Sequence, residues 1–244
     1  MKIDPESKTD LSIQIAKAIR TAILSGEMDV DTRLPSEGDL CDHFSVSRST
    51  VREALKRLAA QNLIRTQRGA TGGAFVNRLS YEDAYDQHVT TSTLLLSMNA
   101  VSFDTACEAR FAMERACVAL STGRRSADHL ANMRAEIFRQ QQSGLSDEGF
   151  CASDVAFHRN LVDGATNPVL SYQLAGAVEA MQPLMNMITF SARSREKIIL
   201  LHRQIVDGLQ DRDTQSIYQA LDGLQAYTLE LAEETRKTRE NSKS

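Results

Sequence analysis

The chain has 244 residues, enough for one large domain or two modest ones with a sizeable core. Hydrophobic residues make up 42% and charged residues 25%, with only 12 glycines and 4 prolines, a composition that excludes disordered and collagen-like chains. The net charge is −4, no apolar run approaches the ~18 residues of a membrane span, and the N-terminus lacks the apolar core of a signal peptide. We therefore expect a cytoplasmic protein without membrane contact. Its four cysteines show no CxxC spacing and are interpreted as reduced packing groups.

Positive charge is concentrated in one short part of the chain. Residues 43–78 contain seven lysines and arginines against a single acidic residue, Glu53. The segments before and after it each carry more acidic than basic side chains. A basic segment in an acidic chain is typical of a local binding surface for a polyanion such as DNA.

Three helices are predicted in the first 62 residues. An apolar stripe of 3.6-residue period runs through residues 11–23, and Gly26 follows as a stop. Ser36 is a good N-cap for a short second helix. Ser47 is a good N-cap for a third helix, whose apolar face is formed by Val51, Ala54, Leu55, Leu58 and Ala59.

A β-hairpin is predicted directly after the third helix. Two β-like runs, 63–67 and 74–76, flank a glycine-rich tip at 68–73. Two helices, a turn, a third helix and a hairpin in fewer than 80 residues predict a winged helix-turn-helix domain over residues 1–78.

The rest of the chain is predicted to be helical. Residues 79–80 are the expected linker, and from Tyr81 onward the apolar pattern has only helical periodicity. We predict an all-α domain of about six to seven helices over residues 81–244, which makes the fold class mainly α with a small β-hairpin wing.

The start of the third helix carries small hydroxyls beside long cations. Arg48 and Arg52 can bond guanine in a major groove, while the hydroxyls of Ser47, Ser49 and Thr50 suit phosphate oxygens. These residue types at a helix start favour a DNA-reading element.

The hairpin tip offers a second DNA contact. Gly69 lets the backbone approach closely, and Arg68 can enter an adjacent minor groove. The alternative is that all these charges form an ordinary solvated helix face. The capped turn, the hydroxyl-rich helix start and the basic hairpin occur together, which favours DNA binding.

The order and spacing of these residues resemble a known family. The runs 33–37 (RLPSE) and 44–55 (FSVSRSTVREAL), followed by Leu58 and Gly69, are similar to the N-terminal domain of GntR-type bacterial transcription regulators. Gly38 departs from the pattern, because these proteins often carry a basic residue there. The DNA-binding residues taken from this resemblance and from the helix pattern are Arg33, Ser36, Ser47, Arg48, Ser49, Thr50, Arg52, Arg68 and Gly69.

Polar groups interrupt the apolar faces of three predicted helices in the second domain. Arg110 and Glu114 lie on the apolar face of a helix at 102–121, Asp154 and His158 on that of a helix at 147–165, and His202 on that of a helix at 195–211. Because burial of an unpaired charge is costly, these side chains must pair with one another or line a polar cavity.

Asp154, His158 and His202 are suitable ligands for Zn²⁺ or a similar divalent ion. The alternative is that the histidines are hydrogen-bonded core residues and that Asp154 pairs with His158, its neighbour one helical turn away. Residue types alone leave both interpretations open.

Residues 81–232 resemble the helical effector-binding domain of the FadR-like branch of the same family, with weaker motifs than the DNA-binding domain. The resemblance implies a metal held by one Asp and three His. No histidine follows His202, and Leu224 stands about where the family places the last ligand. The resemblance therefore predicts either a three-ligand metal site or a lost one.

Arg110 is the candidate for holding an anionic effector, because a guanidinium in an apolar cavity binds a carboxylate with two hydrogen bonds. The alternative is a structural ion pair between Arg110 and Glu114. Arg159 is turned about 100° away from His158 and is expected on the surface. The effector-binding residues expected from the sequence are Arg110, Glu114, Asp154, His158 and His202.

Together these features predict a regulator whose DNA affinity responds to a metabolite. The expected partners are a palindromic double-stranded DNA operator, a small organic-acid-like anion and a second copy of the chain, and the resemblance implies repression. A structural DNA-binding protein would not need polar groups facing a helical core. A metalloenzyme with vestigial DNA binding is the other alternative. The sequence lacks HExxH, a Ser/His/Asp arrangement and a phosphate loop, so we do not expect an enzyme.

Overall fold

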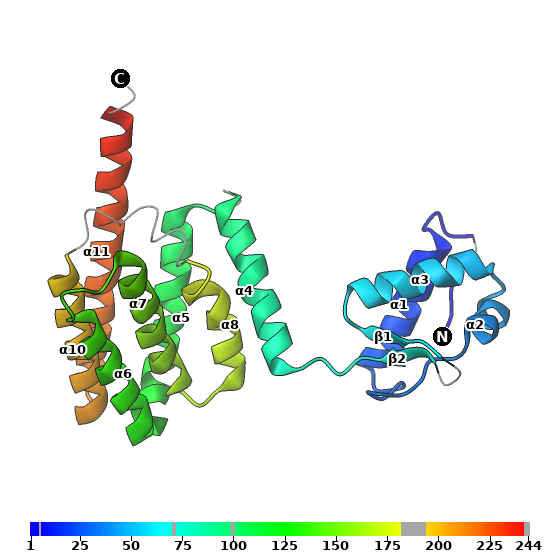
Figure 1. Cartoon of the computed structure of the whole chain (residues 1–244), viewed down its shortest axis with the longest axis horizontal. Helices are drawn as coiled ribbons and strands as arrows, with labels where there is room; N and C mark the ends of the chain where they lie inside the picture. The colour runs from blue at the N-terminus through cyan, green and yellow to red at the C-terminus, as the bar shows by residue number, and fades with distance from the viewer. Residues whose placement is uncertain (5, 70–71, 99–100, 182–193, 242–244) are drawn as a thin grey trace. The chain divides into compact units, whose positions relative to one another are not determined.

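The computed structural model describes all residues except 5, 70–71, 99–100, 182–193 and 242–244 (Figure 1). Its contacts divide the chain into two compact units, Met1–Ala84 and Tyr85–Ser244. Each unit has a hydrophobic core of its own. Among the described residues, no helix has the length and apolar character needed to span a membrane.

The first unit combines three helices with one antiparallel hairpin. Side-chain oxygens of Asp10, Ser36 and Ser47 cap the three helices, and Ser36 forms a reciprocal capping box with Asp39. Ser45 adopts the left-handed conformation (φ 54°), which ends the second helix and redirects the chain into the third. The elements are α1 (Leu11–Leu24), α2 (Glu37–Phe44), α3 (Arg48–Ala60), β1 (Ile64–Gln67) and β2 (Gly73–Val76).

The hairpin is tied to the segment that precedes α2. Ile64 pairs with Val76 in the antiparallel register, and Arg33 forms an isolated bridge with Phe75. The Leu34 amide donates to the carbonyl of Ala74 at 2.8 Å. The core beneath consists of apolar side chains from every element: Ile15, Ala16, Ile19, Leu34, Leu40, Phe44, Val51, Ala54, Leu58, Ile64 and Val76.

The second unit is a helical bundle. Serine N-caps start α5, α6, α7 and α10, and Asn167 caps α8 with a proline at its first position. Helix α5 packs against α7, α8 and α11, while α6 packs against α7 and α10, and the C-terminal part of α11 extends beyond the other helices (Figure 1). The helices are α4 (Tyr81–Ser97), α5 (Phe103–Arg124), α6 (Ala127–Gln140), α7 (Asp147–Asp163), α8 (Pro168–Val178), α10 (Arg195–Asp211) and α11 (Thr214–Asn241).

The predicted fold class is confirmed: the chain is mainly α, with one two-stranded sheet among the described residues. The predicted N-caps Ser36 and Ser47 are those observed. Of the predicted hairpin tip, residues 70 and 71 lie outside the described residues. Helix α4 begins at Tyr81, and the limits 1–78 and 81–244 remain a prediction.

The cysteines are packing groups, as interpreted from the sequence. Cys107, Cys117 and Cys151 are buried, and Cys41 is partly buried. Burial raises the pKa of the Cys107 thiol to about 11, which keeps it protonated near neutral pH.

Candidate functional site

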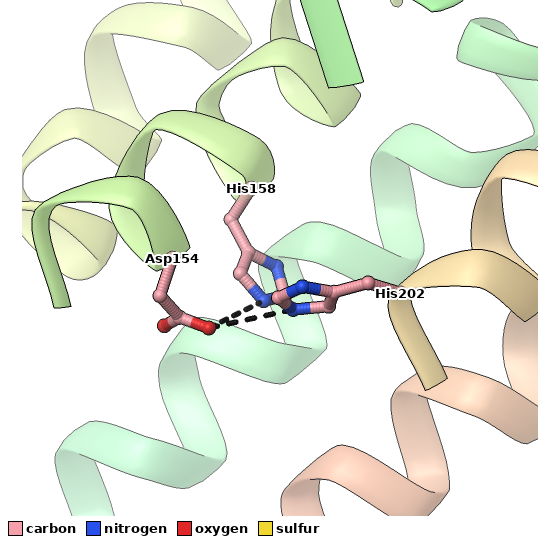
Figure 2. Close-up of side chains that lie close together, drawn as sticks. All are labelled: Asp154, His158 and His202. Atoms are coloured by element: carbon pink, nitrogen blue, oxygen red, sulfur yellow. Dashed lines mark ion pairs between the residues drawn. The ribbon is translucent and has the colours of Figure 1, made fainter. Parts of the chain in front are cut away.

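Three metal-capable side chains meet inside the helical unit. Asp154 and His158 lie one turn apart on α7, and His202 approaches them from α10 (Figure 2). Asp154 Oδ1 is 3.3 Å from His202 Nε2 and 3.9 Å from His158 Nε2. One ligand atom from each of the three residues lies within 4.8 Å of the other two. Both histidines are buried, and Asp154 is 14% exposed.

The far nitrogen of each imidazole is held by a different side chain. Glu114 Oε2 lies 2.6 Å from His158 Nδ1, and Gln140 Oε1 lies 2.9 Å from His202 Nδ1. Both acceptors are almost fully buried. A proton on each Nδ1 satisfies these bonds and leaves both Nε2 atoms unprotonated, each within 4 Å of Asp154 Oδ1.

This arrangement fits a divalent metal ion. His202 Nε2 is buried without a hydrogen-bond partner, although a carboxylate oxygen lies 3.3 Å away. Burial lowers the pKa of His202 against the opposing effect of Asp154, which favours the neutral ligand form. Two acceptors that face each other at this distance repel unless a proton or a cation lies between them. An Asp and two neutral imidazoles form a donor set suited to Zn²⁺ or Fe²⁺ with open positions.

Charges surrounding the site keep Asp154 ionised. Burial alone would raise the pKa of this carboxyl, but the neighbouring His202, His158 and Arg110 outweigh burial and hold it well below its usual range. The same balance, with His158 and Arg110 opposing burial, lowers the pKa of Glu114. Asp154 and Glu114 are therefore ionised, and the Arg110 guanidinium lies beside both carboxylates.

Arg110 and Glu114 form a buried ion pair on α5. Arg110 Nε donates to Glu114 Oε1 at 2.8 Å, and Arg110 Nη2 lies 3.8 Å from Asp154 Oδ2. Arg110 is 3% exposed and Glu114 is fully buried. The structure thus brings all five expected effector-site residues together, with Glu114 behind His158 and Arg110 beside Asp154. The role of each in effector binding remains a proposal.

Two features of this region were not predicted from the sequence. Gln140 continues the buried stripe of α6 that includes Leu130, Met133 and Ile137. A polar residue on this apolar face could have indicated from the sequence that Gln140 has a buried hydrogen-bond partner. Arg159 is not a surface residue, because its side chain is only 22% exposed. It bonds Asp163 on α7 and Glu179 at the end of α8, and its guanidinium lies 4.3 Å from the ring centroid of Tyr85 on α4.

The start of α3 presents the expected hydroxyl and cationic groups on an exposed surface. Ser47 Oγ lies 2.8 Å from the hydroxyls of both Ser49 and Thr50 while it caps the helix. Arg48 is exposed, and the Arg52 side chain, 63% exposed, pairs with Glu37 at 2.9 Å. This pair joins α3 to the start of α2, where Ser36 is the N-cap.

The Arg33 side chain packs against two glycines of the hairpin wing, Gly72 and Gly73. Arg33 Nη2 donates to the Gly72 carbonyl at 2.6 Å. Gly73 has φ 148°, and a Cβ there would come within 2.8 Å of Arg33 Nε. Gly69 also has a positive φ (109°), while Arg68 is exposed. Glycine is therefore required where Arg33 crosses the wing.

Comparison with known proteins identifies both units. Residues 11–76 match the family profile described as bacterial regulatory proteins, gntR family, and residues 105–225 match that of the FCD domain. The chain belongs to the GntR family. As a GntR-family protein it is a DNA-binding transcription regulator that responds to a metabolite.

Similar GntR proteins span most of the chain. It is 25% identical over 236 residues to the galactonate operon transcriptional repressor of Escherichia coli K12, covering 96% of this chain and 98% of the relative. It is 27% identical to the gluconate operon transcriptional repressor of Bacillus licheniformis, covering 90% and 85% of the two chains. A GntR-family regulator from Pseudomonas syringae, of known crystal structure, is 21% identical with a TM-score of 0.48, covering 96% and 89%.

Proposed function

We propose that this GntR protein is a homodimeric repressor whose affinity for a palindromic operator is changed by an organic-acid anion bound with a divalent metal in the helical unit. Asp154, His158 and His202 are the proposed metal ligands. The proposal depends on one observation: the Nε2 atoms of His158 and His202 both lie close to Asp154 Oδ1. The Nε2 atom of His202 is also buried and has no hydrogen-bond partner.

The buried charge favours an anion once a metal is bound. Coordination requires neutral imidazoles, so the two carboxylates and Arg110 leave the cluster with a net charge of −1. A divalent ion changes this to +1, and one carboxylate group then neutralises the site. Bound there, the ion would supply positive charge and open coordination positions.

Arg110 is the proposed second contact for that anion. Its Nε is bound to Glu114, while Nη2 lies beside Asp154 at the edge of the metal-ligand set. Glu114 thus holds the guanidinium in a fixed orientation and also orients His158. The two relatives named above regulate galactonate and gluconate operons, which supports a sugar-acid anion as the first class to test.

The proposed DNA surface comprises the start of α3 and the wing. Ser47, Arg48, Ser49, Thr50 and Arg52 would face a major groove, with Ser36 at the start of α2 beside them. Arg68 and Gly69 would approach the adjacent minor groove, and Arg33 would contact DNA from the base of the wing. A single recognition helix reads only a few base pairs, which is why we propose two copies on a palindrome.

Native mass spectrometry and elemental analysis of the full-length protein test the metal and the dimer together. We expect a dimer that contains about one divalent ion per chain, or a metal-free dimer that binds added Zn²⁺. Calorimetry with galactonate, gluconate and citrate then tests the anion, with uncharged galactose as the control. Anion binding should require the metal and disappear in Arg110→Ala. Equal binding to metal-free protein and to Arg110→Ala would show that the effector site lies elsewhere.

A further inference from the structure

Gln140 occupies an unusual position behind the proposed metal site. It is the last residue of α6 and is only 2% exposed. Its Oε1 lies 2.9 Å from His202 Nδ1, but its own Nε2 is buried without a hydrogen-bond partner. An amide, unlike a carboxylate, can present either an acceptor or a donor to an imidazole nitrogen.

Two tautomers of His202 can satisfy the hydrogen-bonding groups on both sides of its ring. With the proton on Nδ1, the imidazole donates to Gln140 Oε1 and its Nε2 lone pair faces Asp154 Oδ1, as a metal ligand requires. With the proton on Nε2, a small movement of the 3.3 Å pair lets the imidazole donate to Asp154 Oδ1, and Nδ1 must then accept from the amide Nε2 of a Gln140 turned by 180°. The imidazole is neutral in both arrangements, and only the position of its proton differs.

His158 has no such choice. The group behind its Nδ1 is Glu114, an ionised carboxylate that can only accept, at 2.6 Å. The proton of a neutral His158 therefore stays on Nδ1, and its Nε2 lone pair always faces the site. The groups behind the two Nδ1 atoms therefore differ: a carboxylate that can only accept lies behind His158, and an amide that can present either end lies behind His202.

We propose that Gln140 is a positioning residue that lets His202 bond Asp154 in the metal-free protein and turns over to prepare His202 as a ligand when a divalent ion binds. This inference rests on the proposed metal site and adds how its occupancy is controlled. Metal binding must displace the Asp154–His202 hydrogen bond, so the amide weakens affinity relative to a group that can only accept.

Two substitutions of Gln140 separate this role from packing. Gln140→Glu keeps the shape but only accepts, so it should bind Zn²⁺ as tightly as the wild type or more tightly. Gln140→Leu removes the acceptor and should weaken Zn²⁺ binding by about 10–100-fold, the usual cost of losing a partner behind a metal-ligating histidine. Gln142→Glu, an exposed position on the same segment, controls for added charge and should bind as the wild type. Affinities are measured on full-length protein by competition with a chelator.

Nitrogen-15 NMR of histidine-labelled protein reads the tautomer directly, with the His202 signal assigned by its loss in His202→Gln. In the wild type we expect the proton on Nε2 without metal and on Nδ1 with Zn²⁺. This measurement needs no variant at Gln140 and therefore holds even if Gln140→Glu does not fold. Tight Zn²⁺ binding with an unchanged tautomer, or equal losses in Gln140→Glu and Gln140→Leu, would overturn the inference and leave the metal site intact. A wild type that binds no divalent ion would overturn both.

Discussion

The two candidate sites keep their polar groups in opposite environments. On α3, Arg48 and Arg52 are exposed, and water can satisfy them when no partner is bound. In the helical unit, Glu114, His158 and His202 are buried, and each depends on a protein group from another helix or turn. Substitutions on α3 should therefore alter binding with little change in stability. Substitutions in the buried cluster should alter both.

The largest effect is expected for Glu114→Ala. This change leaves Arg110 as a buried charge without its carboxylate and removes the acceptor of His158. Loss of one partner of a buried ion pair costs about 3–5 kcal/mol, a large part of a domain's total stability. Urea unfolding monitored by circular dichroism measures it. Asp222→Ala, which breaks the more exposed pair between Arg115 on α5 and Asp222 on α11, should cost at most about 1 kcal/mol. Equal costs would contradict the contrast between buried and exposed pairs.

Zn²⁺ should stabilise the wild type but not His202→Ala. An ion that binds only the folded state adds about 2.7 kcal/mol when its concentration is 100 times the dissociation constant. Removal of one of three ligands should abolish this gain. Thermal unfolding with and without Zn²⁺ measures it, and His43→Ala, which removes a histidine of the first unit, should respond as the wild type does. A gain retained in His202→Ala would place the ion at another site.

Arg48→Ala and Arg52→Ala should each cost about 1–3 kcal/mol in operator binding if the arginine reads a base. Mobility shifts on a duplex that the protein selects from a random pool measure this. Because both side chains are exposed, the melting temperature should stay within a degree or two of the wild type. Arg236→Ala, at an exposed arginine of α11, is the control. Wild-type affinity in both α3 variants would remove this surface from the DNA interface.

The contrast also explains what the sequence could predict. Ser36 and Ser47 are recognisable because a cap acts on amides two or three residues away, and local spacing is enough. Helical phase likewise placed Arg110, Asp154 and His202 toward a common interior. It could not show which helix covers the opposite side of α7, and so Arg159 was wrongly assigned to the surface. Nor could it pair Gln140 with His202, because the two residues are 62 positions apart in the chain.

The smallest effect is expected at Glu179, which accepts from both Arg159 and Tyr85. Burial raises its pKa above the ordinary 4.5, and although Arg159 opposes this, Asp163 and Asp86 add to it. At a pH between the pKa of Glu179 in the unfolded chain and its higher pKa in the folded protein, the folded protein therefore binds more protons than the unfolded chain. The protonated Glu179 contributes its full stabilisation below the unfolded-state pKa, and this stabilisation is lost as the pH rises through the folded-state pKa. Glu179→Gln retains an acceptor but cannot titrate, so the variant should gain stability relative to the wild type as pH rises above about 4.5. Urea unfolding from pH 4 to 7 tests this, with Glu108→Gln, an exposed carboxylate on α5, as control. If the difference between Glu179→Gln and wild type is the same at every pH, burial and the nearby Asp163 and Asp86 do not raise the pKa of Glu179.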